Sequence, residues 1–279
     1  MLSPVTGPSR PAHEAQSLRA AGRAAAAILR RALLSCRHGA RSADVNAVVE
    51  REITRLGAEP LFLGYRQGNA PPFPGVCCVS INSEIVHGVP GASRISAGDV
   101  VSVDVGLRLN GWCADAAASI VVPSAADSPG ISQRRALVAA TQRVLTQSIE
   151  RMRPGVPWSE IALAAENTAL DAGFGIVTEF VGHGVGRQLH EPPKVPMFWT
   201  GYQGEDFVLR EGQVLAIEPI LTLDAAGDWL RGTSPGPANR SRVVGGADHW
   251  TVRTASGKPA CHAEHTVLVT PSGAEVLTA

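Results

Sequence analysis

The chain has 279 residues, with 25 basic and 25 acidic side chains and therefore a formal net charge of zero. This balance argues against a nucleic-acid-binding protein and against a protein that binds a membrane surface by charge. Hydrophobic residues make up 44% of the chain, which is enough for a sizeable core in one large domain or two small ones.

The N-terminal residues and the cysteines indicate the compartment. Residues 1–12 contain three prolines and no apolar run typical of a signal peptide, so we expect a disordered tail followed by a single domain over residues 13–279. The apolar run 24–29 is too short to span a bilayer. Five scattered cysteines without a Cys-x-x-Cys pair favour reduced thiols. We predict a cytoplasmic monomer with no nucleic-acid or membrane partner.

Apolar residues at helical spacing predict four helices, which form two pairs along the chain. Glycines end the second and fourth helices, and Pro154-Gly155 ends the third. The four helices are expected over 18–33, 42–56, 137–152 and 161–172.

The two helical pairs repeat at a nearly constant offset, which indicates an internal duplication. A shift of 114 residues relates the apolar strand that ends at Asp104 to the one that ends at Glu218. If the halves are duplicated, they face each other across one site. A shift of 116 residues superimposes Gly39 on Gly155, Gly57 on Gly173, Leu29 on Leu145, Leu33 on Ile149 and Val45 on Ile161.

Two apolar strands flank Asn110-Gly111, the dipeptide that most strongly favours a two-residue hairpin turn. With this turn, Gly106 lies opposite Asp115. Asp104 is two residues from Gly106, so Asp104 and Asp115 share one face of the hairpin. Buried carboxylates that lie together must share a proton or hold a cation between them.

Three more residues could complete a site with this aspartate pair. Glu218 and Glu264 lie in otherwise apolar strands, the latter in a closing strand expected over 262–270, and His183 lies in a glycine-rich stretch. Each residue alone could be an ordinary surface or core group. Together, four carboxylates and one imidazole suit two divalent ions, with Mn, Fe, Co or Zn favoured. A long Gly- and Pro-rich excursion is expected over 224–246.

From about residue 19 to its C-terminus, the sequence resembles the type I methionine aminopeptidases. The resemblance implies their α+β "pita-bread" metallopeptidase fold, a curved antiparallel sheet with two pairs of helices on its outer face and a pseudo-two-fold axis. The motifs that carry it are Cys78-Val79-Ser80-Ile81-Asn82, Val86-His87-Gly88-Val89-Pro90, Val103-Asp104-Val105, Gly182-His183-Gly184-Val185-Gly186-Arg187, His190-Glu191-Pro192-Pro193, Ile217-Glu218-Pro219 and Glu264-His265-Thr266.

The resemblance also implies a role for each matching residue and a substrate, the N-terminal methionine of peptides and nascent proteins. Asp104 would bind one divalent ion, His183 and Glu218 the other, with Asp115 and Glu264 bridging the two. Glu218, His87 and His190 would be catalytic: Glu218 would take the proton of the attacking water, His87 would contact the scissile nitrogen, and His190 would steady the carbonyl oxygen. The side-chain pocket would contain Tyr65, Cys78, Leu189, Trp250 and Phe62.

The sequence departs from the family pattern in the pocket. Leu189 stands where phenylalanine is usual, Phe62 where cysteine is common, and Ala116 where threonine is usual. A reshaped pocket would suit a specialised enzyme, for instance one that tolerates an inhibitor of its relatives. Two alternatives remain, another aminopeptidase or prolidase of the same fold, and a catalytically idle binding module.

Overall fold

The computed structural model describes residues 7–125, 128–201, 206–224 and 241–279. Its helices are α1 (Ala12–Ser35), α2 (Ser42–Leu56), α3 (Pro129–Arg151) and α4 (Trp158–Asp171), so all four predicted helices are confirmed. The strands are β1 (Glu59–Pro60), β2 (Cys78–Ile81), β3 (Glu84–Val86), β4 (Val100–Leu109), β5 (Trp112–Val121), β6 (Gly175–Ile176), β7 (Gly182–Gly184), β8 (Glu191–Val195), β9 (Val214–Ile217), β10 (Ile220–Thr222), β11 (Val243–Gly245), β12 (Val252–Thr254), β13 (Ala260–His262), β14 (Glu264–Thr270) and β15 (Gly273–Val276).

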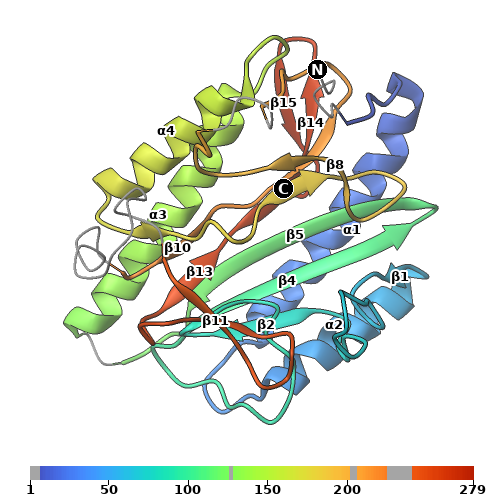
Figure 1. The fold of residues 1–279 in the computed structure, drawn as a ribbon. Helices are drawn as coiled ribbons and strands as arrows, with labels where there is room; N and C mark the ends of the chain where they lie inside the picture. The colour runs from blue at the N-terminus through green and yellow to red at the C-terminus, as the bar shows by residue number, and fades with distance from the viewer. Residues whose placement is uncertain (1–6, 126–127, 202–205, 225–240) are drawn as a thin grey trace.

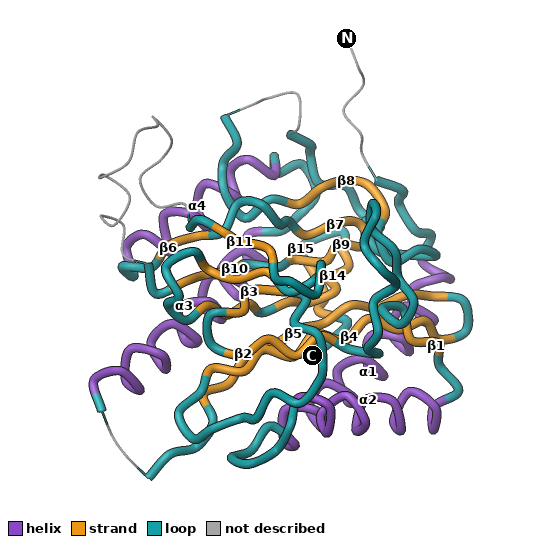
Figure 2. The backbone as a smooth tube through the Cα atoms, turned by 60° about the horizontal axis from the view of Figure 1, so that its bottom comes forward, coloured by secondary structure: helices purple, strands orange, loops and turns teal. Residues whose placement is uncertain are grey.

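A nine-stranded antiparallel sheet organises the fold. Its order is β1-β4-β5-β14-β9-β7-β8, with β2 added at β4 and β15 at β14. In Figure 1, α1 runs behind β4 and β5, while α3 and α4 lie side by side at the left. Figure 2 shows α1 and α2 side by side beneath the strands. The expected α+β architecture, a curved sheet with two helix pairs, is confirmed.

The two helix pairs bury different parts of the sheet. Alternate residues of β4, including Val103 and Val105, pack into a core with α1 and α2. The other core joins α3 and α4 to residues such as Leu215 and Val267 from β9 and β14. Because strand side chains alternate between faces, burying Val103 and Val105 under the helices leaves Asp104 on the opposite face.

The backbone conformation at equivalent positions agrees with the predicted duplication. Gly57, directly after α2, has φ of 62°, and Gly173, two residues after α4, has φ of 81°. Gly98 and Gly212 precede β4 and β9 with φ of 84° and 82°. Glycine adopts this left-handed conformation at little cost, so equivalent turns keep equivalent glycines. The offsets of 116 and 114 therefore reflect equivalent structure.

The central hairpin is as predicted. Asn110 and Gly111 have φ of 51° and 77° in the turn. Gly106 pairs with Asp115 and Asp104 with Ala117, so the two carboxylates share a face. This pairing fixes the first part of the site.

Two segments differ from expectation. Residues 7–11 were expected to be disordered, yet Ser9 forms a β-bridge with Gln213 and α1 begins at Ala12. Residues 1–6 lie outside the described residues. The closing strand is divided at Ala263, because β13 pairs with β10 whereas β14 pairs with β9 and β5.

The expected excursion over 224–246 falls mostly outside the described residues, because 225–240 are not described. Its end forms β11, which joins β12 and β3 in a small sheet. All five cysteines are buried and free, which agrees with the expected reduced thiols. Among the described helices, none is long and apolar enough to cross a membrane.

Candidate metal centre

Neighbouring strands of the main sheet bring the five expected metal ligands together. Asp104 and Asp115 lie on β4 and β5, His183 on β7, Glu218 directly after β9, and Glu264 at the start of β14. All five line one cavity of about 400 Å³. The division of the last strand at residue 263 places Glu264 in the main sheet, opposite Ala117.

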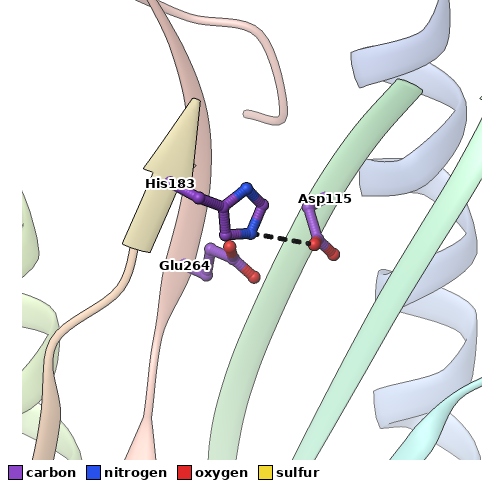
Figure 3. A group of neighbouring side chains, drawn as sticks. All are labelled: Asp115, His183 and Glu264. Carbon is purple, nitrogen blue, oxygen red and sulfur yellow. Dashed lines mark ion pairs between the residues drawn. The ribbon is translucent and has the colours of Figure 1, made fainter. Parts of the chain in front are cut away.

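Three of these side chains lie closest together (Figure 3). Donor atoms of Asp115, His183 and Glu264 all lie within 4.8 Å of one another. His183 Nε2 is 3.6 Å from Asp115 Oδ2. His183 Nδ1 is 2.9 Å from the Gly184 carbonyl oxygen, which can only accept a hydrogen bond, so Nδ1 carries the hydrogen. The lone pair of Nε2 can then bind a metal ion.

The electrostatics of the carboxylates favour a bound cation. Burial, Asp115 and Glu218 raise the pKa of Asp104 well above its usual range. Burial and Asp115 likewise raise the pKa of Glu218 to about 7, and that of Glu264 rises well above its usual range. Ionising these crowded groups without a counter-charge costs free energy.

Two carboxylate oxygens in the site have no hydrogen-bond partner in the part of the chain that the structure describes. Oδ1 of Asp104 and Oδ1 of Asp115 are buried and accept no hydrogen bond from the described residues. Buried polar atoms are normally satisfied, so these oxygens fit a cation as ligands. Burial lowers the pKa of His183, but the hydrogen bond and charge of Asp115 outweigh it and the pKa is raised. The donor set therefore suits divalent metal.

Thr266 fixes the position of Asp115. The Asp115 amide donates to Thr266 Oγ1 at 3.0 Å, and this hydroxyl donates to the Asp115 carbonyl oxygen at 2.7 Å. Thr266 is fully buried on β14, two residues from Glu264. The contact therefore holds two of the carboxylates at a fixed separation.

Two further histidines line the cavity. The rings of His190 and His183 meet edge to face with centroids 4.3 Å apart. The His87 ring packs edge to face on Phe180, at 5.3 Å. Burial lowers the pKa of each of His87 and His190 to about 4, so both are neutral at pH 7. Their ring N–H groups are therefore donors, and each ring keeps one acceptor.

The expected side-chain pocket forms the apolar part of the same cavity. Its lining includes Phe62, Tyr65, Cys78, Leu189 and Trp250, so every predicted site residue lies in one place. A Cβ at Gly106 would lie 2.6 Å from Phe62 Cε1, which explains why glycine stands beside this ring. Phe73 packs on Trp250 with centroids 5.4 Å apart.

Sequence reasoning missed several residues of the cavity. Lys194 faces it because this residue of β8 pairs with His183 of β7. Most of these positions lie outside the quoted motifs, since they reach the cavity through strand pairing and loop packing. Val86 and Gly182 are exceptions, because each precedes a motif histidine. The missed residues are Gln67, Phe73, Val86, Glu179, Phe180, Val181, Gly182 and Lys194.

Known proteins are similar to this chain in sequence and in fold. The profile of metallopeptidase family M24 matches residues 16–271. Methionine aminopeptidase 1 of Mycobacterium tuberculosis is 38% identical over 278 residues, covering 97% of this chain and 94% of that protein. Methionine aminopeptidase 1 of Bacillus subtilis is 35% identical over 240 residues, or 86% of each chain.

Solved structures of the same family of folds are also similar to this chain. The methionine aminopeptidase of Thermotoga maritima has a TM-score of 0.84 at 34% identity, covering 98% of this chain and 99% of that one. A prolidase of Pyrococcus horikoshii, at 23% identity and a TM-score of 0.70, shares the fold over 97% of this chain but 63% of its own. The chain therefore belongs to metallopeptidase family M24, among its methionine aminopeptidases.

Proposed function

We propose that this protein removes the N-terminal methionine from peptides and nascent proteins, using two divalent ions. The observation that carries the proposal is the buried set of four carboxylates and one imidazole, in which Oδ1 of Asp104 and of Asp115 has no partner among the described residues. A set with this much unbalanced negative charge is suited to cations.

The five ligands would hold two ions. Asp104 would bind one, His183 and Glu218 would bind the other, and Asp115 and Glu264 would contribute to both. When bound, divalent ions here supply Lewis acidity, which makes water a nucleophile at neutral pH and polarises a peptide carbonyl. Mn, Fe, Co and Zn all suit oxygen and imidazole ligands.

The protein supplies the proton transfers and the polar contacts. Glu218 lines the cavity beside the other ligands, so its carboxylate is placed to accept a proton from the attacking water and return it to the leaving amine. His190 donates a hydrogen bond to the carbonyl oxygen as negative charge develops there. His87 contacts the nitrogen of the scissile amide.

The pocket selects the side chain of the first residue. Leu189 and Trp250 are 7% and 6% exposed, and Cys78 is 4% exposed. These apolar surfaces suit the unbranched thioether of methionine. The monomeric state and cytoplasmic location expected from the sequence stay predictions.

Hydrolysis of a Met-Ala-Ser peptide tests the proposal. Metal-stripped protein is titrated with Mn, Co, Fe or Zn, beside the Asp104→Asn variant and a Leu-Ala-Ser control peptide. We expect metal-dependent release of methionine alone, and at least a hundredfold loss in the variant, because a ligand is removed. Glu59→Gln, an exposed partner of Arg108 on the far end of the sheet, should retain activity.

Other outcomes separate the alternatives. Cleavage of Xaa-Pro peptides in preference to Met-Ala-Ser would indicate a prolidase. Metal binding without cleavage of any of these peptides would favour a binding module. Efficient cleavage of Leu-Ala-Ser would show that Leu189 and Phe62 have redirected the pocket.

A further inference from the structure

The loop between β7 and β8, residues 185–190, carries two cavity residues, Leu189 and His190. The side chain of Glu191 fastens this loop. Its Oε1 accepts hydrogen bonds from the backbone amides of Arg187 at 2.8 Å and Gln188 at 3.1 Å. The position of His190 therefore depends on how the Glu191 carboxylate is held.

Arg10 holds the second oxygen of that carboxylate. Its guanidinium forms an ion pair with Glu191 Oε2, and the two side chains are 14% and 11% exposed. The Arg10 backbone amide donates to the Gly212 carbonyl oxygen at 2.7 Å, and Ser9 bridges Gln213. The N-terminal segment thus connects the loop to the beginning of β9, whose other end leads to Glu218.

The contact between Arg10 and the loop is close. A Cβ at Gly186 would lie 2.1 Å from Arg10 Nη2 and 2.7 Å from Glu191 Oε1, so only glycine leaves room for this pair. The Gly186 carbonyl oxygen accepts from the Cys113 amide at 2.8 Å. Fixing Gly186 on both sides limits how far the loop can move.

Trp112 provides the surface on which the loop rests. Cζ of Arg187 lies 3.6 Å and Cζ of Arg10 lies 5.4 Å from its ring centroid. Trp112 is 3% exposed at the start of β5, the strand that carries Asp115. Two guanidinium groups over one buried indole are a favourable arrangement. The N-terminal segment, the loop and β5 therefore form one packed unit.

We propose that Arg10 is a positioning residue for the aminopeptidase reaction, acting through Glu191 to hold His190 and Leu189 in the cavity. The inference rests on the proposed function, because it assigns His190 the developing oxyanion. An ion pair that is largely shielded from water restrains a loop more than an exposed pair. The Arg10 side chain is then part of the active-site support.

The test combines kinetics with hydrogen exchange. The variants are Arg10→Ala, Arg10→Lys and Glu191→Gln, with Ser9→Ala as the matched control in the same segment. For metal-loaded protein and Met-Ala-Ser, we expect Arg10→Ala to lower kcat about tenfold or more while KM changes less than about threefold, because the oxyanion contact acts in the transition state. Arg10→Lys should recover part of kcat, and Ser9→Ala should match the wild type.

Amide exchange is measured on metal-free protein, so it does not depend on activity. Arg10→Ala should speed exchange of the Arg187 and Gln188 amides, while helix α3 stays as protected as in the wild type. Glu191→Gln keeps an acceptor for these amides but loses the charge, so it should reproduce the kcat loss even if Arg10→Ala fails to fold. Combining Arg10→Ala with Glu191→Gln should add little.

Two results would overturn the inference. One is a kcat within about twofold of wild type in both Arg10→Ala and Glu191→Gln, whatever the exchange result. The other is a kcat loss with unchanged exchange of the loop amides, which would place the role of Arg10 elsewhere. A wild-type protein that releases no methionine contradicts the proposed function instead, and the exchange data then still decide whether Arg10 restrains the loop.

Discussion

The hydroxyl oxygen of Tyr65 lies 3.2 Å from Nδ1 of His190, although 125 residues separate them in the chain. The two rings meet edge to face with centroids 5.6 Å apart. Because a neutral imidazole has one donor and one acceptor nitrogen, a partner at Nδ1 restricts the ring's orientation and leaves Nε2 for the substrate.

Removing this hydroxyl should slow the reaction. Tyr65→Phe keeps the ring that packs 6.3 Å from Trp250 but loses the hydrogen bond. A net value of about 1 kcal/mol for such a bond predicts a fall in kcat of about fivefold. Steady-state kinetics on Met-Ala-Ser would measure it, with Leu63→Ala in the same loop as control, since Leu63 is 50% exposed. An unchanged kcat would show that the hydroxyl does not position His190.

The Glu218 carboxyl should make the stability of the metal-free protein depend on pH. The pKa of Glu218 is raised from 4.5 to about 7 by burial and by Asp115. The folded state therefore holds this proton more tightly than the unfolded chain does. Its contribution is fully present below pH 4.5 and is lost as the pH rises through about 7, a loss of about 3 kcal/mol. Denaturant unfolding between pH 5 and 8, with a chelator present, measures the change.

Glu218→Gln is the control for this pH dependence. The amide cannot ionise, so the variant should lose less stability than the wild type between pH 5 and 8. Divalent metal should also stabilise the wild type most at the upper end of this range, because the carboxylates must be ionised to bind it. A wild type that loses no more stability than Glu218→Gln through this range would contradict the expectation.

Leu189 should set the shape of the side-chain pocket. It is 7% exposed and lines the cavity, and Leu189→Phe adds volume to that wall. We expect kcat/KM to fall more for Leu-Ala-Ser than for Met-Ala-Ser, because a branched side chain fits a narrowed pocket less well than an unbranched one. The same peptides measure Leu63→Phe as control. Equal ratios in all three proteins, with an unchanged inhibitor response, would remove the idea of a reshaped pocket.

Alanine at Gly57 and at Gly173, in the two equivalent turns, should lower the free energy of unfolding by similar amounts. Gly57 and Gly173 have positive φ, and the space that a Cβ would occupy is open at both, so only backbone strain opposes the change. Gly57→Ala and Gly173→Ala should each cost about 1 kcal/mol in the free energy of unfolding. Gly245→Ala is the control, since this glycine also has open space but no positive φ. A cost at only one of the two glycines would argue against equivalent turns.

Local patterns in the sequence were sufficient for the four helices, the central hairpin and the first half of the site. The 3.6-residue spacing of apolar side chains marked all four helices, and Asn110-Gly111 fixed the register that places Asp104 and Asp115 on one face. These features depend on backbone geometry within a few residues. The internal repeat extended the same reasoning to Glu218, because two equivalent strands end at equivalent positions.

Long-range packing decided the rest. That β14 lies between β5 and β9, which brings Glu264 toward His183, is a property of the strand order and not of any local spacing. Lys194 and Phe180 reach the cavity in the same way, and so does Tyr65 from a distant loop. The N-terminal residues 7–11 look disordered by composition, yet Arg10 packs on Trp112 and Glu191.

The sequence alone identified the candidate metal-binding groups, and its two-residue strand period placed Asp104 and Asp115 on one face. Only the tertiary structure decided which buried carboxylates lack a partner, how Tyr65 meets His190, and that Arg10 supports the loop. The physical reason is that periodicity and turn preferences act over neighbouring residues, whereas burial and electrostatic coupling arise between groups that the fold brings together from distant parts of the chain.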